Sequence, residues 1–147
     1  MNDIPNSLSK IKKIYVSLES PKTIPNTNFK SEWVGPIWFQ RIAKISLNFL
    51  SFKNWWGKSF DGTETAYNLF TKKESLDLEK KYPMKTYIGL SKIDNKPCLF
   101  LEYGKNSPFP WPLFVDEFRV LPNGSFLGMN YPKFLPKLAL PFLIHPS

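Results

Sequence analysis

The chain has 147 residues, of which 42% are hydrophobic and 22% charged, a balance typical of one globular domain and not of a disordered or low-complexity chain. Its net charge of +8 is compatible with nucleic acid or an anionic membrane as a partner. The arginines are limited to Arg41 and Arg119, and the lysines are spread from Lys10 to Lys137, which argues against specific nucleic-acid recognition.

The single cysteine, Cys98, excludes an intramolecular disulfide. The N-terminal residues lack the apolar core of a signal peptide, and no apolar run reaches the ~18 residues of a membrane-spanning helix. We therefore expect a cytoplasmic protein in which residues 1–147 form a single domain.

The first predicted elements are a helix and a strand. Apolar side chains from Leu8 to Leu18 recur at helical spacing, and the Pro-containing segment SPKTIPN follows, which predicts a short helix over residues 7–18. Residues 28–34 alternate as in a strand, and Gly35-Pro36 ends that strand.

A second helix is predicted over residues 37–50. One stripe of this helix is apolar and a second apolar row lies beside it: Trp38, Ile42, Ile45 and Phe49 in the stripe, and Phe39, Ala43 and Leu50 in the row. Together they form a wide apolar face, and we expect this helix to pack on a sheet. The alternative is a helix lying on a membrane surface, because basic residues flank the apolar face.

The second half of the chain predicts two hairpins and a covering tail. Residues 84–93 and 98–103 flank the polar loop Asp94-Asn95-Lys96, and residues 114–121 and 125–131 flank Pro122-Asn123-Gly124. From residue 132 onward a proline recurs every four or five residues, which favours an extended segment that covers an apolar surface.

Three segments, taken in order, resemble the mainly bacterial, poorly characterised family named for its Gly-x-Trp-x-Gly signature, together with that family's companion domain of unknown function. They are Ser31-Glu32-Trp33-Val34-Gly35, with serine in place of the first glycine; Trp55-Trp56-Gly57-Lys58-Ser59-Phe60; and Asp116-Glu117-Phe118-Arg119 followed by Leu127-Gly128-Met129, in which the methionine follows the glycine directly.

The resemblance implies an architecture and no established activity. The expected fold is mainly β (α+β), a small antiparallel barrel or strongly curved sheet of the lipocalin-like kind with one or two helices. The N-terminal helix and linker would occupy residues 1–27, the barrel with its helix at 37–50 residues 28–131, and the Pro-rich tail residues 132–147.

The abundance of aromatic residues is the main pointer to function. With 5 Trp, 6 Tyr and 13 Phe, rings recur around glycine and proline breaks, a pattern that suits either the lining of a cavity or an ordinary core. We predict non-catalytic binding of a small apolar or lipid-like ligand. The candidate ligand-binding residues are Trp33, Trp56, Lys58, Phe60, Tyr103, Asp116, Phe118 and Arg119.

Two of these candidates carry a charge-based expectation. Lys58 and Arg119 are the predicted partners of a carboxylate head group. For a buried Arg119, Trp33 and Asp116 are the expected ring and carboxylate contacts, and a surface arginine on an outward strand face is the alternative.

Catalytic and metal chemistry find little support in the sequence. His145 is the single histidine and lies in the Pro-rich tail, so no His/Cys metal site, no nucleophilic triad and no cofactor are expected. The carboxylates Glu32, Asp61, Glu102 and Asp116, with Tyr103 as a donor, leave open a carboxylate-dependent enzyme, isomerase-like or cyclase-like, in the same pocket. A basic peripheral membrane protein or nucleic-acid-associated protein is the third alternative.

Overall fold

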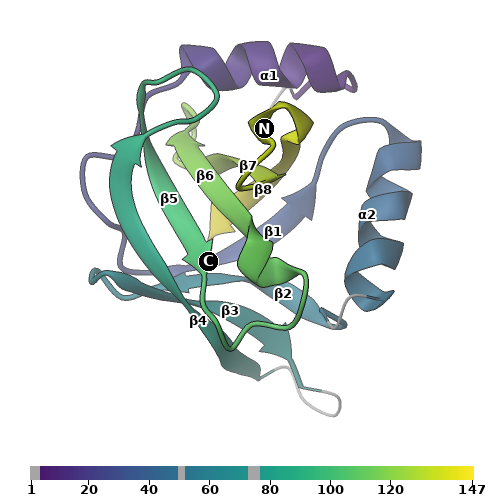
Figure 1. Cartoon of the computed structure of the whole chain (residues 1–147), viewed down its shortest axis with the longest axis vertical. Helices are drawn as coiled ribbons and strands as arrows, with labels where there is room; N and C mark the ends of the chain where they lie inside the picture. The colour runs from purple at the N-terminus through teal and green to yellow at the C-terminus, as the bar shows by residue number, and fades with distance from the viewer. Residues whose placement is uncertain (1–3, 50–51, 73–76) are drawn as a thin grey trace.

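Eight antiparallel strands close into a barrel in the computed structural model, which describes residues 4–49, 52–72 and 77–147. Each strand pairs with the next along the chain, and the last strand pairs with the first (Figure 1). The strands are β1 (Asn28–Trp33), β2 (Trp55–Phe60), β3 (Thr65–Thr71), β4 (Leu78–Leu90), β5 (Pro97–Tyr103), β6 (Phe114–Val120), β7 (Phe126–Pro132) and β8 (Leu140–Pro146). The helices are α1 (Leu8–Ser17), α2 (Ile37–Phe49) and the short 3₁₀ helices η1 (Trp111–Leu113) and η2 (Pro136–Leu138). The predicted small antiparallel barrel with helices is confirmed.

Helix α1 covers the outer surface of the barrel. The Ser7 hydroxyl caps it by accepting a hydrogen bond from the Lys10 backbone N–H, and the helix ends at Ser17, within one residue of the predicted range at each end. Its buried side chains, Ile11 and Tyr15, join an apolar cluster on the outer face of β5 to β8. Helix α1 therefore covers part of the outer surface of the barrel.

The two predicted hairpins are confirmed. Strands β4 and β5 are joined by residues 91–96, where the Ser91 N–H donates to the Lys96 carbonyl at 2.8 Å. Strands β6 and β7 are joined by residues 121–125, and Gly124 adopts the left-handed conformation (φ 87°) that this tight turn requires. The first strand of the β4–β5 hairpin begins at Leu78, six residues before the predicted start at Met84.

The Pro-rich tail is not a covering segment, contrary to the prediction. Its last residues form β8, which pairs with β7 on one side and with β1 on the other and so closes the barrel. The prolines of this strand, Pro141 and Pro146, lie near its ends, where the missing N–H interrupts the ladder least. A prediction based on proline spacing alone was therefore wrong for a strand that is paired on both sides.

Strands β2 and β3 lie in a stretch for which the sequence predicted no individual strand. The side-chain alternation is broken there by register shifts between Trp55 and Gly57 and between Ala66 and Asn68. Gly57 lies where β1 comes closest, because a Cβ at this position would be 1.9 Å from the Phe29 carbonyl oxygen. A side chain is therefore excluded at this position of β2.

Helix α2 meets the barrel with only part of its predicted apolar face, since Phe39 and Ala43 line the pocket on the barrel side. The stripe residues Trp38, Ile42 and Ile45 are 60%, 55% and 67% exposed, whereas Phe39 is buried. Phe39 lies over Gly35, which has φ 99° and no side chain to obstruct the ring. The Phe49 side chain and the predicted helix end at Leu50 lie outside the described residues. None of the described helices is long and apolar enough to cross a bilayer.

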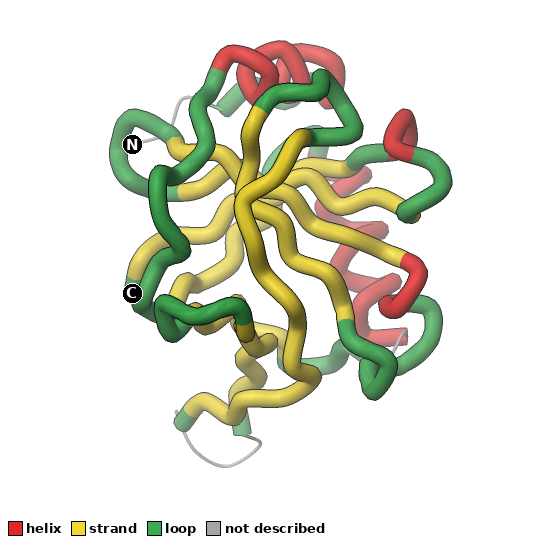
Figure 2. The backbone as a smooth tube through the Cα atoms, turned by 60° about the vertical axis from the view of Figure 1, so that its left-hand side comes forward, coloured by secondary structure: helices red, strands yellow, loops and turns green. Residues whose placement is uncertain are grey.

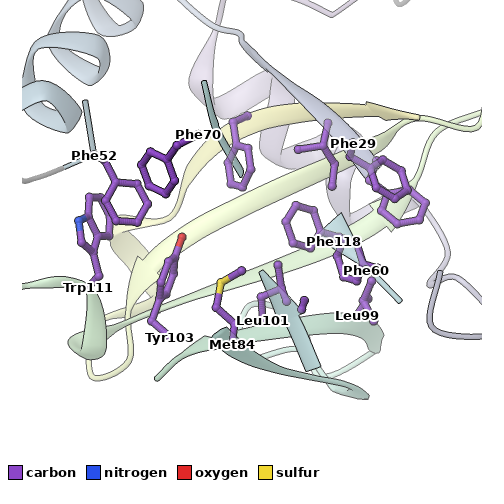
Figure 3. Packing of buried hydrophobic residues seen from close by; sticks show 14 residues of the cluster. Phe29, Phe52, Phe60, Phe70, Met84, Leu99, Leu101, Tyr103, Trp111 and Phe118 are labelled. Atoms are coloured by element: carbon purple, nitrogen blue, oxygen red, sulfur yellow. The ribbon is translucent and has the colours of Figure 1, made fainter. Parts of the chain in front are cut away.

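The barrel interior is divided into a packed end and an end near α2. At the packed end Phe29, Phe60 and Phe118 come together, with Phe29 and Phe60 centroids 5.5 Å apart (Figure 3). Gly128 makes room for this packing, because a Cβ there would lie 2.6 Å from the Phe118 ring. At the other end, Phe52, Tyr103 and Trp111 form a second group of rings.

Candidate functional site

A pocket of about 220 Å³ lies between α2 and the end of the barrel. Its walls come from α2, the chain around η1, and the strands β1, β2, β5, β6, β7 and β8, and Figure 2 shows α2, η1 and η2 on the same side of the barrel. The lining residues are Trp33, Phe39, Ile42, Ala43, Ser46, Leu47, Phe52, Trp55, Tyr103, Pro110, Trp111, Phe114, Asp116, Asn130, Leu140, Pro141 and Phe142. Most of these are apolar, so the pocket suits an apolar guest.

Aromatic rings in mutual contact make up the walls. Trp33 and Trp55 have centroids 5.9 Å apart, and Trp55 lies edge to face with Phe142 at 6.2 Å. Across the pocket, Phe52 and Trp111 have centroids 4.7 Å apart. Because each ring is held by its neighbours, the walls are preorganised for a flat or chain-like apolar molecule.

The floor of the pocket is a buried polar network around Asp116. Its Oδ2 accepts a hydrogen bond from the Tyr103 hydroxyl at 2.8 Å and lies 3.0 Å from Lys58 Nζ. Its Oδ1 accepts from Asn130 Nδ2 at 2.6 Å. Lys58 Nζ also donates to Tyr103 Oη at 2.8 Å and to Asn68 Oδ1 at 2.9 Å. Three acceptors thus occupy the three N–H groups of the ammonium.

Burial sets the protonation of this network. It lowers the pKa of Lys58 from its ordinary value, and the nearby Asp116 carboxylate opposes that shift. Burial also raises the pKa of Tyr103 well above its ordinary value, and Asp116 adds to the rise. Tyr103 therefore stays a neutral donor. The floor offers a guest the carboxylate of Asp116 and the amide of Asn130, which can accept a hydrogen bond from a donor group or from a cation.

The structure brings three of the sequence-predicted ligand-binding residues into the pocket. These are Trp33, Tyr103 and Asp116. Lys58 lies one layer behind them, 1% exposed and bonded to the floor residues. Phe60 and Phe118 belong to the packed end of the barrel.

Trp56 is half-buried and does not line the pocket. Its backbone carbonyl accepts a hydrogen bond from the Ser31 hydroxyl at 2.8 Å. Its neighbour Trp55 contributes the ring that lines the pocket, because the register shift between Trp55 and Gly57 moves the alternation of β2 by one residue.

Arg119 lies outside the barrel, which corrects its assignment to the ligand site and to contacts with Trp33 and Asp116. It follows Asp116 and Phe118, which face inward, so strand alternation turns it outward. Its guanidinium is fully buried over the Tyr15 ring, 4.6 Å from the centroid, and makes two 2.6 Å hydrogen bonds to Asp94. A ring and a carboxylate do surround it, but they come from α1 and the β4–β5 turn.

The Asp94–Arg119 pair predicts a pH-dependent stability. Hydrogen bonds from Arg119 lower the pKa of Asp94, so the pair stabilises the fold above the unfolded-state pKa of Asp, and this contribution is lost as pH falls through the lower folded-state pKa. We expect Asp94→Asn to reduce the free energy of unfolding by about 1–3 kcal/mol at about pH 7 and by much less near about pH 2. Urea unfolding across this range, with exposed Glu64→Gln as the control, measures it. If Asp94→Asn lowered the free energy of unfolding by the same amount at every pH, the pH-dependent role of the Asp94–Arg119 pair would be refuted.

A second buried carboxylate, Glu117, fastens α1 to the barrel. It accepts hydrogen bonds from the hydroxyls of Tyr15 at 2.7 Å, Ser91 at 2.5 Å and Tyr131. Burial, followed by the Glu117 charge, raises the pKa of Tyr15, and burial likewise raises the pKa of Cys98 nearby. These groups do not line the pocket between α2 and the barrel; they hold α1 and the β4–β5 turn against β6 and β7.

Of the four carboxylates proposed for acid–base chemistry, Asp116 alone lines the pocket. Glu32 is exposed and contacts His145 at 2.7 Å, exposed Asp61 accepts from the Thr63 N–H, and Glu102 faces the outside of β5. Among the described residues no three His, Cys, Asp or Glu side chains come together in a way that could hold a metal ion.

The sequence analysis overlooked two asparagines. Asn130 and Asn68 both bond into the floor network, although neither belongs to the motifs singled out above. The predicted β6–β7 hairpin contains a signal for one of them, because its register places Asn130 opposite Asp116. No comparable signal existed for Asn68, since the pairing of β3 was not predicted.

Comparison with known proteins supports the fold alone. No family model matches the chain, and no curated protein matches it by sequence. The chain is similar in structure to a crystallised protein from Thermomonospora curvata, with a TM-score of 0.65 and 13% sequence identity over 95% of this chain and 86% of the other. The resemblance to the Gly-x-Trp-x-Gly family therefore stays a prediction.

Proposed function

We propose that the protein binds a small apolar or lipid-like molecule non-covalently in the pocket beneath α2, with a polar donor group of the ligand on the floor. The observation that carries the proposal is a pocket walled by mutually supported rings whose single charged lining residue, among those described, is Asp116. Apolar walls with a few placed polar groups are the usual composition of small-molecule sites.

The size of the pocket limits the ligand. An apolar cavity of about 150 Å³ can hold benzene, so about 220 Å³ suits a bicyclic ring or a short chain. Each methylene moved from water into such a site contributes about 0.8 kcal/mol. Burial against the rings can therefore give useful affinity without a covalent step.

The floor favours a hydroxyl, amine or amide head group over a carboxylate. Asp116 places negative charge at the pocket wall, and the three N–H groups of Lys58 already have acceptors. Arg119 lies on the other side of the sheet. Neither basic group predicted for a carboxylate head is thus free to receive one, and Asp116 with Asn130 supports a donor instead.

Isothermal titration calorimetry of the full chain with 1-naphthol tests this proposal. The bicyclic ring matches the pocket in size and apolarity, and the hydroxyl supplies the donor. We expect saturable binding of one molecule per chain with a Kd on the order of micromolar, given the ligand's few non-hydrogen atoms. An absence of saturable heat up to the solubility limit of 1-naphthol would contradict the proposal.

A further inference from the structure

Large apolar side chains gather at the surface around the mouth of the pocket. Among the described residues, ten of the twelve exposed large hydrophobic side chains lie on α2, beside or within η1, or in residues 134–140. Phe109, before η1, is 79% exposed, and Phe134, before η2, is 75% exposed. A concentration of this kind marks an interaction site more often than a bare surface.

These three segments border one opening. Ile42, Pro110 and Leu140, one from each segment, all line the pocket, and the Lys133 N–H donates to the Leu113 carbonyl at 2.9 Å. Figure 2 shows α2 and the two 3₁₀ helices on the same side of the barrel. We call the exposed side chains of this side the apolar rim: Trp38, Ile45, Phe109, Leu113, Phe134 and Leu138.

The charge around the apolar rim has one sign. Residues 34–60 contain no aspartate or glutamate, and the two acidic residues in 103–147, Asp116 and Glu117, are fully buried. The same segments carry basic side chains that are exposed or half-buried: Arg41, Lys44, Lys53, Lys105, Lys133 and Lys137. These two stretches of the chain therefore combine exposed apolar side chains with positive charges and contain no exposed aspartate or glutamate.

We propose that the apolar rim docks on an anionic membrane surface. Trp38, Phe109 and Phe134 would insert at the level of the lipid head groups, where large rings are favoured, and the lysines would lie beside lipid phosphates. Both contributions are those of a peripheral protein, namely buried apolar area and attraction to anionic lipid. Docking does not require an occupied pocket, although it would bring the pocket mouth to the bilayer, a source of apolar ligands.

Flotation of the full chain with lipid vesicles tests the inference. We expect the protein to bind vesicles of phosphatidylcholine mixed with phosphatidylserine, to bind pure phosphatidylcholine vesicles more weakly, and to dissociate partly as salt is raised. A failure to bind the anionic vesicles at low salt would overturn the proposal. This outcome is independent of 1-naphthol binding, so the two proposals can fail separately.

Two pairs of matched variants locate the docking surface. Ile45→Ser with Phe109→Ser removes rim side chains, and Ile88→Ser with Leu90→Ser removes two exposed side chains of β4. Lys44→Glu with Lys137→Glu reverses rim charges, and Lys22→Glu with Lys92→Glu reverses exposed charges elsewhere. We expect the rim charge variant to weaken partitioning by about 30-fold or more and the controls to change little.

Equal losses of vesicle binding in the rim variants and in the control variants would overturn the inference. A second copy of the chain could also cover an apolar surface of this kind. Analytical ultracentrifugation distinguishes that case. If the protein does not bind anionic vesicles but forms a concentration-dependent dimer, and the double variant Ile45→Ser with Phe109→Ser disrupts this dimer, the rim is a self-association surface instead. Thermal unfolding of each variant checks that the surface changes leave the fold intact.

Discussion

Replacing Lys58 with methionine is expected to lower the free energy of unfolding by about 3–5 kcal/mol. The methionine keeps the length of the apolar stem but removes the ammonium that lies 3.0 Å from Asp116 Oδ2. Asp116 would then keep only the neutral donors Tyr103 and Asn130 as partners in the barrel interior. Equilibrium urea unfolding measures the loss.

The double variant Lys58→Met with Asp116→Asn is the control for this prediction. It removes both charges of the buried pair while leaving an oxygen that can accept from the Tyr103 hydroxyl. We expect its loss of unfolding free energy to be smaller than the sum of the losses of the two single variants. The difference, which is the coupling energy of the pair, should be of the order of 1–3 kcal/mol. Strictly additive losses would show that Lys58 and Asp116 do not act as a pair.

Replacing Ala43 with tryptophan is expected to abolish binding of 1-naphthol, with a loss of about 100-fold or more. Ala43 lines the pocket from α2, and an indole in its place would occupy the space proposed for the ligand. A drop of this size corresponds to about 2.7 kcal/mol of binding free energy. Calorimetric titration of the variant alongside the unmodified chain measures it.

The neighbouring substitution Lys44→Trp is the matched control for Ala43→Trp. It adds the same ring to α2 at an exposed position that does not line the pocket. We expect it to bind 1-naphthol like the unmodified chain. If Ala43→Trp bound equally well, the ligand would lie elsewhere and the assignment of the pocket would be wrong.

The hairpins could be predicted because their information is local. Turn residues and flanking β-formers together predicted the β6–β7 pair, and the observed register places Asp116 opposite Asn130. Strand β8 could not be predicted in the same way, since its pairing with β1 joins residues more than a hundred positions apart, such as Trp33 and Phe142. Its prolines suggested an irregular tail, whereas tertiary pairing makes it a strand.

The packing of α2 was predicted only in part, for a related reason. Periodicity identified the apolar stripe of Trp38, Ile42 and Ile45, but it does not say what an apolar stripe meets. The buried residue at the helix start is Phe39, which lies over Gly35 and belongs to the row beside the stripe. The exposed stripe is also what the membrane-surface alternative requires, and its residues Trp38 and Ile45 belong to the apolar rim.

Residue type was enough to identify part of the candidate site, whereas the alternation of side chains along each strand determines which of the other candidates face the barrel interior. Trp33, Tyr103 and Asp116 were singled out by type and do line the pocket. Arg119 was assigned to the same site although it is three positions from Asp116, an odd spacing that places it on the opposite face of a strand. Strict use of the two-residue period would have excluded it.

The affinity of the unmodified chain for 1-naphthol relative to 1-naphthoate tests the central claim most directly. The two ligands share a ring system and differ in presenting a hydroxyl donor or a carboxylate to the floor formed by Asp116 and Asn130. We expect 1-naphthol to bind at least about tenfold more tightly, because a carboxylate would meet the negative charge of Asp116. Equal affinities, or tighter binding of 1-naphthoate, would contradict an apolar pocket with an acceptor floor.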